Sequence, residues 1–175
     1  MPERFARIAI GNTFLPIGIG KNEMFDRWAS NVSQQVSDWG LVVAAGCSIR
    51  QLTEQEMYAY EAPFPTEEYK AAPRVMPHIV PASENHFSVN ENIGAWKRLE
   101  QWEKPFLCLF SNRDRMMKGL DKIFIAKVPG TKGQNHYTIE GGNHFLQEDC
   151  GPVIAEKLIE FISANPLENN IRSKL

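Results

Sequence analysis

The sequence predicts an α/β fold in which about three parallel strands are flanked by helices and covered by a helical insertion. Residues 106–110, FLCLF, form a continuous apolar run, which is typical of a parallel strand covered on both faces. Strand and helix patterns alternate from residue 90 onward, as they do around a parallel sheet. Prolines crowd residues 63–81, so only short helices fit in the middle of the chain.

The first part of the chain is predicted to form a strand, a loop and a helix. Residues 7–10, RIAI, have the pattern of a short buried strand that ends at Gly11 and Asn12. Residues 13–22 are expected to be a loop because they contain a proline and two glycines. Residues 23–39 are predicted to be a helix because apolar side chains recur at helical spacing. These apolar residues are Met24, Phe25, Trp28 and Val32.

A capping box predicts a short helix in the middle of the chain. Thr53 has the position of the N-cap, and Glu56 follows it three residues later, so the helix begins there and ends near Tyr60. The prolines that follow are Pro63, Pro65, Pro73, Pro77 and Pro81. The predicted division of the chain is a sheet strand of the core in residues 1–13, a helical cap in residues 14–89 and a C-terminal core in residues 90–175.

The C-terminal part is predicted to alternate helices and strands. The predicted elements are a helix at 90–103, a strand at 106–110, a helix at 118–128, a strand at 136–139 and a helix at 151–164. Lys104 and Pro105 end the first helix, and Pro152 lies in the first turn of the last helix, where proline is tolerated. The polar tail from Asn165 is expected to fray.

The composition excludes several classes of protein. With 19 basic and 21 acidic residues, the net charge is -2, so no field of one sign attracts nucleic acid or an anionic membrane. Cys47, Cys108 and Cys150 lie far apart and form no CxxC pair, which argues against a disulfide framework and against a zinc site. No segment reaches the ~20 apolar residues of a membrane span, and no signal peptide is recognised. We therefore expect a cytoplasmic protein without a metal or cofactor.

Two polar side chains follow predicted strands of the sheet. Asp114 comes shortly after the FLCLF strand, and His144 comes after the strand at 136–139. Ligands of open α/β sheets bind beyond the carboxyl ends of the strands, so both side chains are expected at one site. An acid followed by a histidine along the chain is also the order of the last two members of a hydrolase triad. The acid orients the imidazole, and the imidazole acts as the base.

Four segments resemble haloalkane dehalogenases of the subfamily that uses Asp-His-Asp catalysis. They are ERFARIAIGNTFLPIG, AYEAPFPTEEYKAAPRVMPHIVP, WEKPFLCLFSNRD and GGNHFLQED. The resemblance runs from about residue 3 to residue 162, and the APFP segment together with the HFLQED ending is the specific signal. It implies the C-terminal part of an α/β-hydrolase fold with a helical cap. It also implies hydrolysis of carbon–halogen bonds, with a small apolar halogenated substrate, water and a halide ion as partners.

The resemblance assigns roles to single residues. Asp114 matches the family acid, and His144 matches the base that activates water to hydrolyse an ester intermediate. Trp28 matches a cap tryptophan that binds the halide, because an indole N–H is a donor without an acceptor. Trp39 is a weaker candidate for that role. The residues expected in the pocket wall or in the core are Phe25, Leu15 and Phe145.

The resemblance also implies that the nucleophile is missing. In this family, the aspartate nucleophile lies some tens of residues before the segment that resembles ERFARIAI. We therefore expect the chain to be a fragment that is inactive alone. The strand at residues 7–10 would then have an unpaired edge, which favours self-association or pairing with the missing half.

Two alternatives remain open at the level of sequence. An epoxide hydrolase uses the same triad with a pair of cap tyrosines, and Tyr58, Tyr60 and Tyr69 are available for this role. A non-catalytic protein, or one half of a split enzyme, would act only by docking with a partner chain.

Overall fold

The computed structural model describes residues 2–18, 23–34, 40 and 46–167 of the chain. Its sheet has three parallel strands, β1 (Ile8–Ile10), β2 (Phe106–Ser111) and β3 (Tyr137–Ile139), in the order β1-β2-β3. β1 pairs with the first half of β2, where Ile8 lies opposite Phe106, and β3 pairs with the second half, where Ser111 lies opposite Ile139. The three predicted strands and their parallel arrangement are therefore confirmed.

The central strand is covered on both faces, as its apolar run predicts. All six residues of β2 are buried. Because side chains alternate along a strand, they divide between two hydrophobic clusters. The first contains Phe106, Cys108 and Phe110, and the second contains Leu107 and Leu109.

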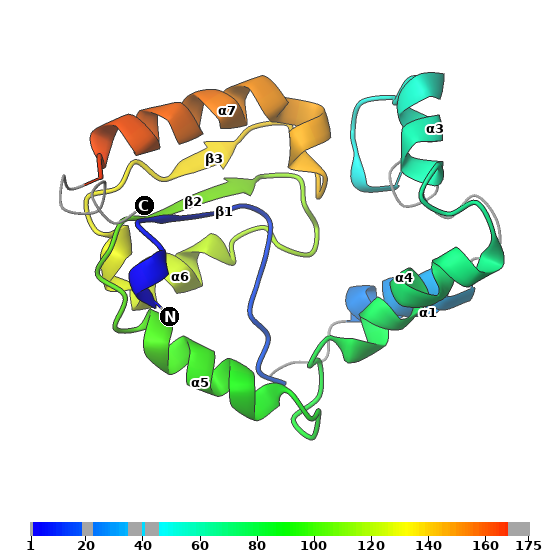
Figure 1. The fold of residues 1–175 in the computed structure, drawn as a ribbon, viewed down its shortest axis with the longest axis horizontal. Coiled ribbons are helices and arrows are strands. Elements are labelled where there is room, and N and C mark those ends of the chain that lie inside the picture. Colours follow the sequence, from blue (N-terminus) through cyan, green and yellow to red (C-terminus); the bar gives the residue numbers. More distant parts are fainter. Residues whose placement is uncertain (1, 19–22, 35–39, 41–45, 168–175) are drawn as a thin grey trace.

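Helices on either side of the sheet complete these clusters (Figure 1). On one side, α5 (Val89–Leu99) and α6 (Asp121–Lys127) add Trp96 and Phe124 to the first cluster. On the other side, α7 (Leu146–Ala164) adds Phe161 to the second. The sheet is therefore the middle layer of three.

Two predicted helix boundaries in this part are wrong by several residues. The helix predicted to reach residue 103 ends at Leu99, because the N–H of Trp102 turns back to the Leu99 carbonyl at 3.0 Å. The helix predicted from residue 118 begins at Asp121, because Gly119 has a φ of 84° and interrupts the right-handed turns before it. α7 consists of a short first turn from Leu146 and a longer helix that follows a break at Cys150, so the helix predicted at 151–164 is present with Pro152 in its first turn.

The middle of the chain forms short helices apart from the sheet. Thr53 and Glu56 form both hydrogen bonds of the predicted capping box at the start of α3 (Glu54–Glu61). α1 (Glu23–Gln34) covers the described part of the helix predicted at 23–39, and residues 35–39 lie outside the described residues. The remaining short helices are η1 (Pro2–Arg4), η2 (Glu67–Lys70), α4 (Ala71–Val75), η3 (Met76–Ile79) and η4 (Pro129–Thr131).

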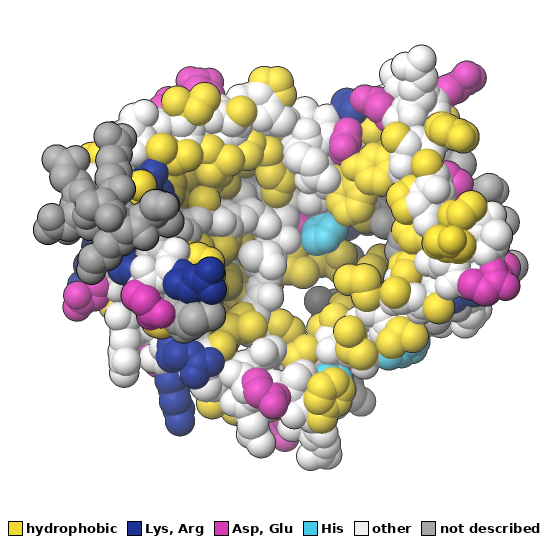
Figure 2. Space-filling view, viewed as in Figure 1, with side chains coloured by type: hydrophobic (Ala, Val, Ile, Leu, Met, Phe, Trp, Pro, Cys, Tyr) yellow, Lys and Arg dark blue, Asp and Glu magenta, His cyan; other side chains and the backbone are white. Residues whose placement is uncertain are grey.

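α1, α3 and α4 lie beyond the ends of the strands, to one side of the sheet (Figure 1). In the face shown in Figure 2, the molecule is hollowed between these helices and the sheet, and hydrophobic side chains surround the hollow. Within the described ranges, no helix combines the length and the hydropathy that a membrane crossing needs.

Candidate active site

Asp114 is a buried carboxylate just beyond the end of β2. Its side chain is only 2% exposed, and its Oδ2 lies 2.7 Å from Nδ1 of His144. Its other oxygen, Oδ1, accepts the backbone N–H groups of Met116 at 2.9 Å and Met117 at 3.1 Å. The loop after β2 therefore fixes one oxygen and leaves the other to hold the histidine.

The charge of Asp114 follows from these contacts. Burial acts to raise its pKa, but the hydrogen bond from His144 and those from the backbone N–H groups outweigh it, so the pKa lies below its ordinary value of 3.8. An ionised carboxylate only accepts hydrogen bonds, so Nδ1 of His144 carries the shared proton. This leaves Nε2 of His144 available to take a proton from water, which is the arrangement of an acid–base pair.

Asn12 joins the ends of the three strands beneath His144. Its amide group donates to the carbonyl of Asn143 at 2.7 Å, to the carbonyl of His144 at 3.3 Å and to Oγ of Ser111 at 2.8 Å. Its Oδ1 accepts the N–H of Ser111 at 2.8 Å. Asn12 is buried and has a φ of 39°, a conformation that asparagine tolerates better than most residues.

The sequence reading treats Asn12 only as the end of a strand. The signal that was missed is that a polar residue lies two positions after the strand at residues 8–10, at the same edge of the sheet as Asp114 and His144.

The backbone on both sides of His144 is also fixed. The N–H of Asn143 donates to Oδ2 of Asp149 at 2.8 Å. The N–H of Phe145 donates to the carbonyl of Cys47 at 2.9 Å. Neither Cys47 nor Asp149 is assigned a role by the sequence, because both contacts form between segments that lack a local pattern.

A pocket of about 640 Å³ contains the acid–base pair. The residues of its wall on the sheet side are Arg113, Asp114, Arg115, Met116, Asn143 and His144. The residues on the opposite side are Trp28, Gly46, Cys47 and Ile49. The structure therefore brings together Asp114, His144 and Trp28, the three predicted residues with chemical roles, around one space.

Trp28 faces this pocket from α1. Its ring lies beside that of Phe25, with 5.6 Å between the ring centres. Among the described residues, its indole N–H has no hydrogen-bond partner. Trp39 lies outside the described residues.

None of the three apolar residues expected in the pocket wall or in the core is among the residues that line this pocket. Leu15 packs against the first hydrophobic cluster, and its carbonyl accepts the indole N–H of Trp96 at 2.8 Å, which makes it a core residue. Phe25 packs against Trp28, behind the pocket wall. Phe145 stacks between His144 and Tyr60, with ring-centre distances of 6.1 and 5.8 Å.

The three tyrosines named as candidates for an epoxide hydrolase are exposed to solvent or bonded elsewhere. Tyr58 and Tyr69 are 77% and 62% exposed, so they point into solvent. The hydroxyl of Tyr60 donates to Glu148 at 2.6 Å. None of these tyrosines lines the pocket.

Two other kinds of chemistry, a cysteine nucleophile and a bound metal ion, can be compared with the described residues. Burial, together with the negative charge of Asp114, raises the pKa of the Cys47 thiol to about 11, so it is a weak candidate for a nucleophile. Within the described ranges, no three His, Cys, Asp or Glu side chains gather in a group that would hold a metal ion.

The sequence is similar to curated haloalkane dehalogenases over most of its length. It is 42% identical over 168 residues to the haloalkane dehalogenase of Psychrobacter cryohalolentis. The aligned region covers 94% of this chain and 55% of that protein. It is 38% identical over 161 residues to the haloalkane dehalogenase of Mycobacterium marinum, and the aligned region covers 91% of this chain and 54% of that protein. The chain therefore spans about half the length of the curated relatives it matches. No protein-family model matches the chain.

Solved structures with the same fold are also haloalkane dehalogenases. The enzyme of Agrobacterium tumefaciens C58 has a TM-score of 0.75 at 17% identity, covering 94% of this chain and 60% of that one. The tetrameric enzyme of Paraglaciecola agarilytica NO2 has a TM-score of 0.75 at 21% identity, covering 88% of this chain and 51% of that one. The described strands and helices therefore form part of an α/β-hydrolase fold, as the resemblance implies.

Proposed function

We propose that this chain, a relative of the haloalkane dehalogenases over about half of their length, takes part in the hydrolysis of carbon–halogen bonds. It supplies the acid, the base and a hydrogen-bond donor to the departing halide. The observation that carries this proposal is the Asp114–His144 pair, which lies in the wall of the same pocket as Trp28. Such a pocket has a base at one wall and a donor for a leaving anion at the other. The helical cap in residues 14–89 is proposed to close this pocket over an apolar substrate.

The proposed reaction has two steps. In the first, a carboxylate oxygen displaces the halide, so that a carbon–oxygen bond forms and the halide leaves with the bonding electron pair. The N–H of Trp28 stabilises the departing halide because it is a preorganised donor at the site of developing charge. The product of this step is an ester of the carboxylate.

In the second step, His144 activates water against this ester. Nε2 takes a proton from water as the water oxygen attacks the ester carbonyl carbon, and Asp114 stabilises the imidazolium that forms. The ester bond breaks, the proton passes to the departing alkoxide to form the alcohol, and the carboxylate is free again.

The attacking carboxylate is proposed to come from outside this chain. Among the described residues that line the pocket, Asp114 is the one carboxylate, and both of its oxygens already accept hydrogen bonds. The relatives are about twice as long as the matched region, so a complementary half of such an enzyme is the expected source. The chain of 175 residues is therefore expected to be inactive alone.

A complementation assay tests this proposal. The chain is assayed for halide release from a bromoalkane, alone and after co-expression with the N-terminal half of the Psychrobacter cryohalolentis relative. We expect no turnover by the chain alone, and turnover in the mixture that disappears with His144→Ala and falls with Trp28→Phe. Turnover by the chain alone, or activity that survives His144→Ala, would contradict it. Diol formation from styrene oxide without halide release would support an epoxide hydrolase instead.

The exposed edge of β1 favours a second candidate, a half-protein that works by pairing with another chain. In the described sheet β1 pairs with β2 alone, and Ala9 at its centre is exposed. An open strand edge is a template for a further strand, from a complementary half or from a second copy. Sedimentation of the isolated chain separates these outcomes: association that Ala9→Lys abolishes supports pairing at this edge, and a monomer at all concentrations argues against a second copy.

A further inference from the structure

The loop that carries His144 is held by a backbone hydrogen bond on each side of the histidine, one to α7 and one to the segment around Cys47. The N–H of Asn143, just before it, donates to the carboxylate of Asp149 at 2.8 Å. The N–H of Phe145, just after it, donates to the carbonyl of Cys47 at 2.9 Å. Cys47 lines the same pocket as His144. The loop that carries the base is therefore bonded both to α7 and to the segment around Cys47.

Asp149 extends the first of these bonds into the same wall. Its Oδ2 holds the Asn143 N–H, and its Oδ1 accepts the N–H groups of Ile49 at 2.8 Å and Arg50 at 3.0 Å. One carboxylate therefore satisfies three backbone donors from segments about 100 residues apart in the sequence. Asparagine, the neutral side chain of the same shape, has only one oxygen and cannot accept all three of these bonds in the same way.

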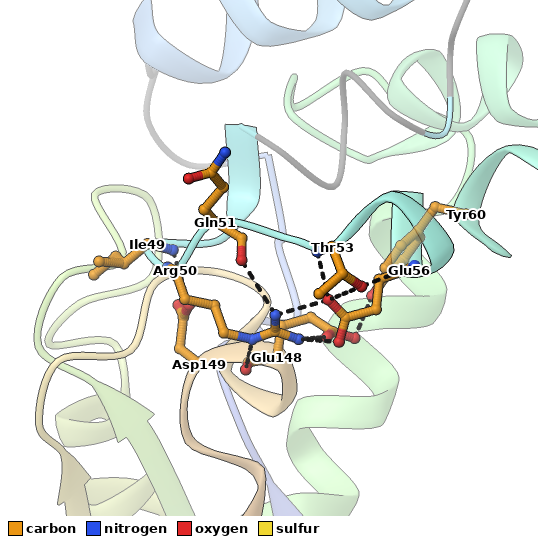
Figure 3. A network of polar contacts seen from close by, with 8 residues as sticks. All are labelled: Ile49, Arg50, Gln51, Thr53, Glu56, Tyr60, Glu148 and Asp149. Carbon is orange, nitrogen blue, oxygen red and sulfur yellow. Dashed lines mark hydrogen bonds and ion pairs between the residues drawn. The ribbon is translucent and has the colours of Figure 1, made fainter. Parts of the chain in front are cut away.

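Arg50 links this point to helix α3 (Figure 3). Its Nε donates to the Glu148 carbonyl at 2.6 Å, and one terminal nitrogen lies 2.7 Å from both the Glu148 and the Glu56 carboxylates. The other terminal nitrogen donates to Glu56 at 2.9 Å. Hydrogen bonds from Arg50 and Thr53 lower the pKa of Glu56 to about 2, so the Arg50–Glu56 pair stays charged across the neutral range.

Tyr60 provides a third link between α3 and the histidine loop. Its hydroxyl donates to the other oxygen of Glu148 at 2.6 Å, and its ring stacks on Phe145 at 5.8 Å. The first turn of α7 thus receives an arginine and a tyrosine from the cap within a few residues of His144 (Figure 3).

We infer that Arg50 and Asp149 are positioning residues for the base: they clamp the cap to the His144 loop, so that the imidazole reaches Asp114 when the cap is seated. This inference rests on the proposed function, since it assigns the clamp to the same acid–base pair. The cap then closes over a substrate in the same movement that brings the His144 imidazole to Asp114. When the clamp is broken, Asn143 loses its acceptor, and the loop that carries His144 is released from one side.

The inference is tested by NMR on the chain itself, without turnover. The probe is the low-field resonance of the His144 Nδ1–H, which is identified by its loss in Asp114→Asn. The variants are Asp149→Asn, which keeps the shape of the side chain, and Arg50→Lys, which keeps the charge but loses the two-sided guanidinium contact. The matched control is Glu100→Gln, which breaks the exposed Lys127–Glu100 ion pair, 2.8 Å long, on the far side of the sheet.

We expect the His144 Nδ1–H to exchange with water about tenfold faster in Asp149→Asn and Arg50→Lys. The reason is that losing a hydrogen bond to a charged group changes the equilibrium between the closed and the open loop by about tenfold or more. The amide of Asn143 is expected to exchange faster in Asp149→Asn by a similar factor. Glu100→Gln is expected to leave both unchanged. All measurements are made well below the melting temperature of each variant, so that a loss of global stability alone does not move the probe.

Three results separate the possible failures. If the wild-type resonance is present and neither clamp variant changes its exchange, the clamp is only structural and the inference is overturned, while the proposed function stands. If the wild-type chain is folded and shows no resonance that depends on Asp114, the acid–base pair is absent and the proposed function fails first. If the wild-type chain shows neither this resonance nor protected Asn143 and Phe145 amides, the clamp does not hold the loop, and the inference is overturned.

Discussion

The two walls of the pocket are held in place by different forces. On the sheet side, all six residues of β2 are buried, and two hydrophobic clusters cover its faces. Among the helices beyond the strand ends, α3 and α4 contain no buried residue, and α1 contains the buried Ala29 and Val32. The segment 46–50 is joined to the His144 loop by the Phe145–Cys47 backbone hydrogen bond and by charged hydrogen bonds around Arg50 and Asp149.

This difference matches the chemistry proposed for each wall. Apolar packing is non-directional, dense and difficult to deform, which suits a carboxylate and an imidazole that must meet at 2.7 Å. Charged contacts between half-exposed side chains are weaker and are screened by salt, which suits a wall that moves to admit a substrate. Four measurements test this contrast.

The largest effect is expected from the core of the sheet. Phe110→Ala removes a buried ring from the first cluster and should lower the free energy of unfolding by about 3–5 kcal/mol, because a cavity is added to the lost transfer free energy. Tyr58→Ala on α3, where the side chain is 77% exposed, should change it by less than about 0.5 kcal/mol. Urea unfolding measures both. Equal effects of the two substitutions would break the contrast between core and cap.

The second effect concerns the strand ends beneath the site. Asn12→Ala leaves the Ser111 N–H without its acceptor in a buried place, and should cost about 1–3 kcal/mol of unfolding free energy. Asn12→Gly removes the same bonds but tolerates the φ of 39°. The difference between the two variants in urea unfolding therefore measures the backbone strain. If Asn12→Ala unfolds like the wild type, Asn12 does not hold the strand ends together.

The third effect is a pH dependence of Asp114. The pKa of Asp114 in the folded chain lies below 3.8, so its contribution to stability is complete above that pH and is lost as the pH falls through the folded pKa. The difference in unfolding free energy between wild type and Asp114→Asn should therefore be at its full value well above about pH 4 and shrink as the pH falls below it. Unfolding in urea at a series of pH values measures this difference. A difference that grows on acidification would contradict an ionised, paired Asp114.

The smallest effect is on the reactivity of Cys47, which faces the acid–base pair from the cap wall. Because its pKa is raised to about 11, alkylation by iodoacetamide near neutral pH should be slower than that of a free thiol by about a hundredfold. Asp114→Asn removes one cause of the raised pKa and should increase the rate a few-fold. Mass spectrometry of the Cys47 peptide measures the rate, with urea-unfolded chain as the reference. Rapid alkylation of the folded wild type would show that the cap wall does not shield this thiol.

Local patterns predict the framework of the molecule well, because each depends on neighbouring residues. The FLCLF run predicts a strand buried on both faces, and Thr53 with Glu56 predicts the start of α3. Helix ends were predicted less well: the positive φ of Gly119 and the turn at Trp102 shorten two helices by several residues. Such ends depend on single backbone conformations and on tertiary contacts, which periodicity does not contain.

The candidate site divides in the same way. Asp114 and His144 could be paired from the sequence, because the carboxyl ends of parallel strands meet at one edge of a sheet. The sequence does not reveal which residues hold the histidine loop. Asn12 and Ser111 are 99 residues apart, and Arg50 and Glu148 are 98 apart. Leu15 was expected in the pocket wall or in the core, and only the packed structure places it in the core.

The sequence by itself therefore determined the sheet, the order of its elements and the meeting of Asp114 with His144, since strand patterns and chain order carry that information. The tertiary structure alone decided how the base is held. Hydrogen bonds across about 100 residues depend on where the cap comes to rest against the sheet, and no local pattern records that position. For the same reason, the resemblance singles out Trp28 in the sequence, but only the fold places it in the wall of the pocket that contains Asp114 and His144.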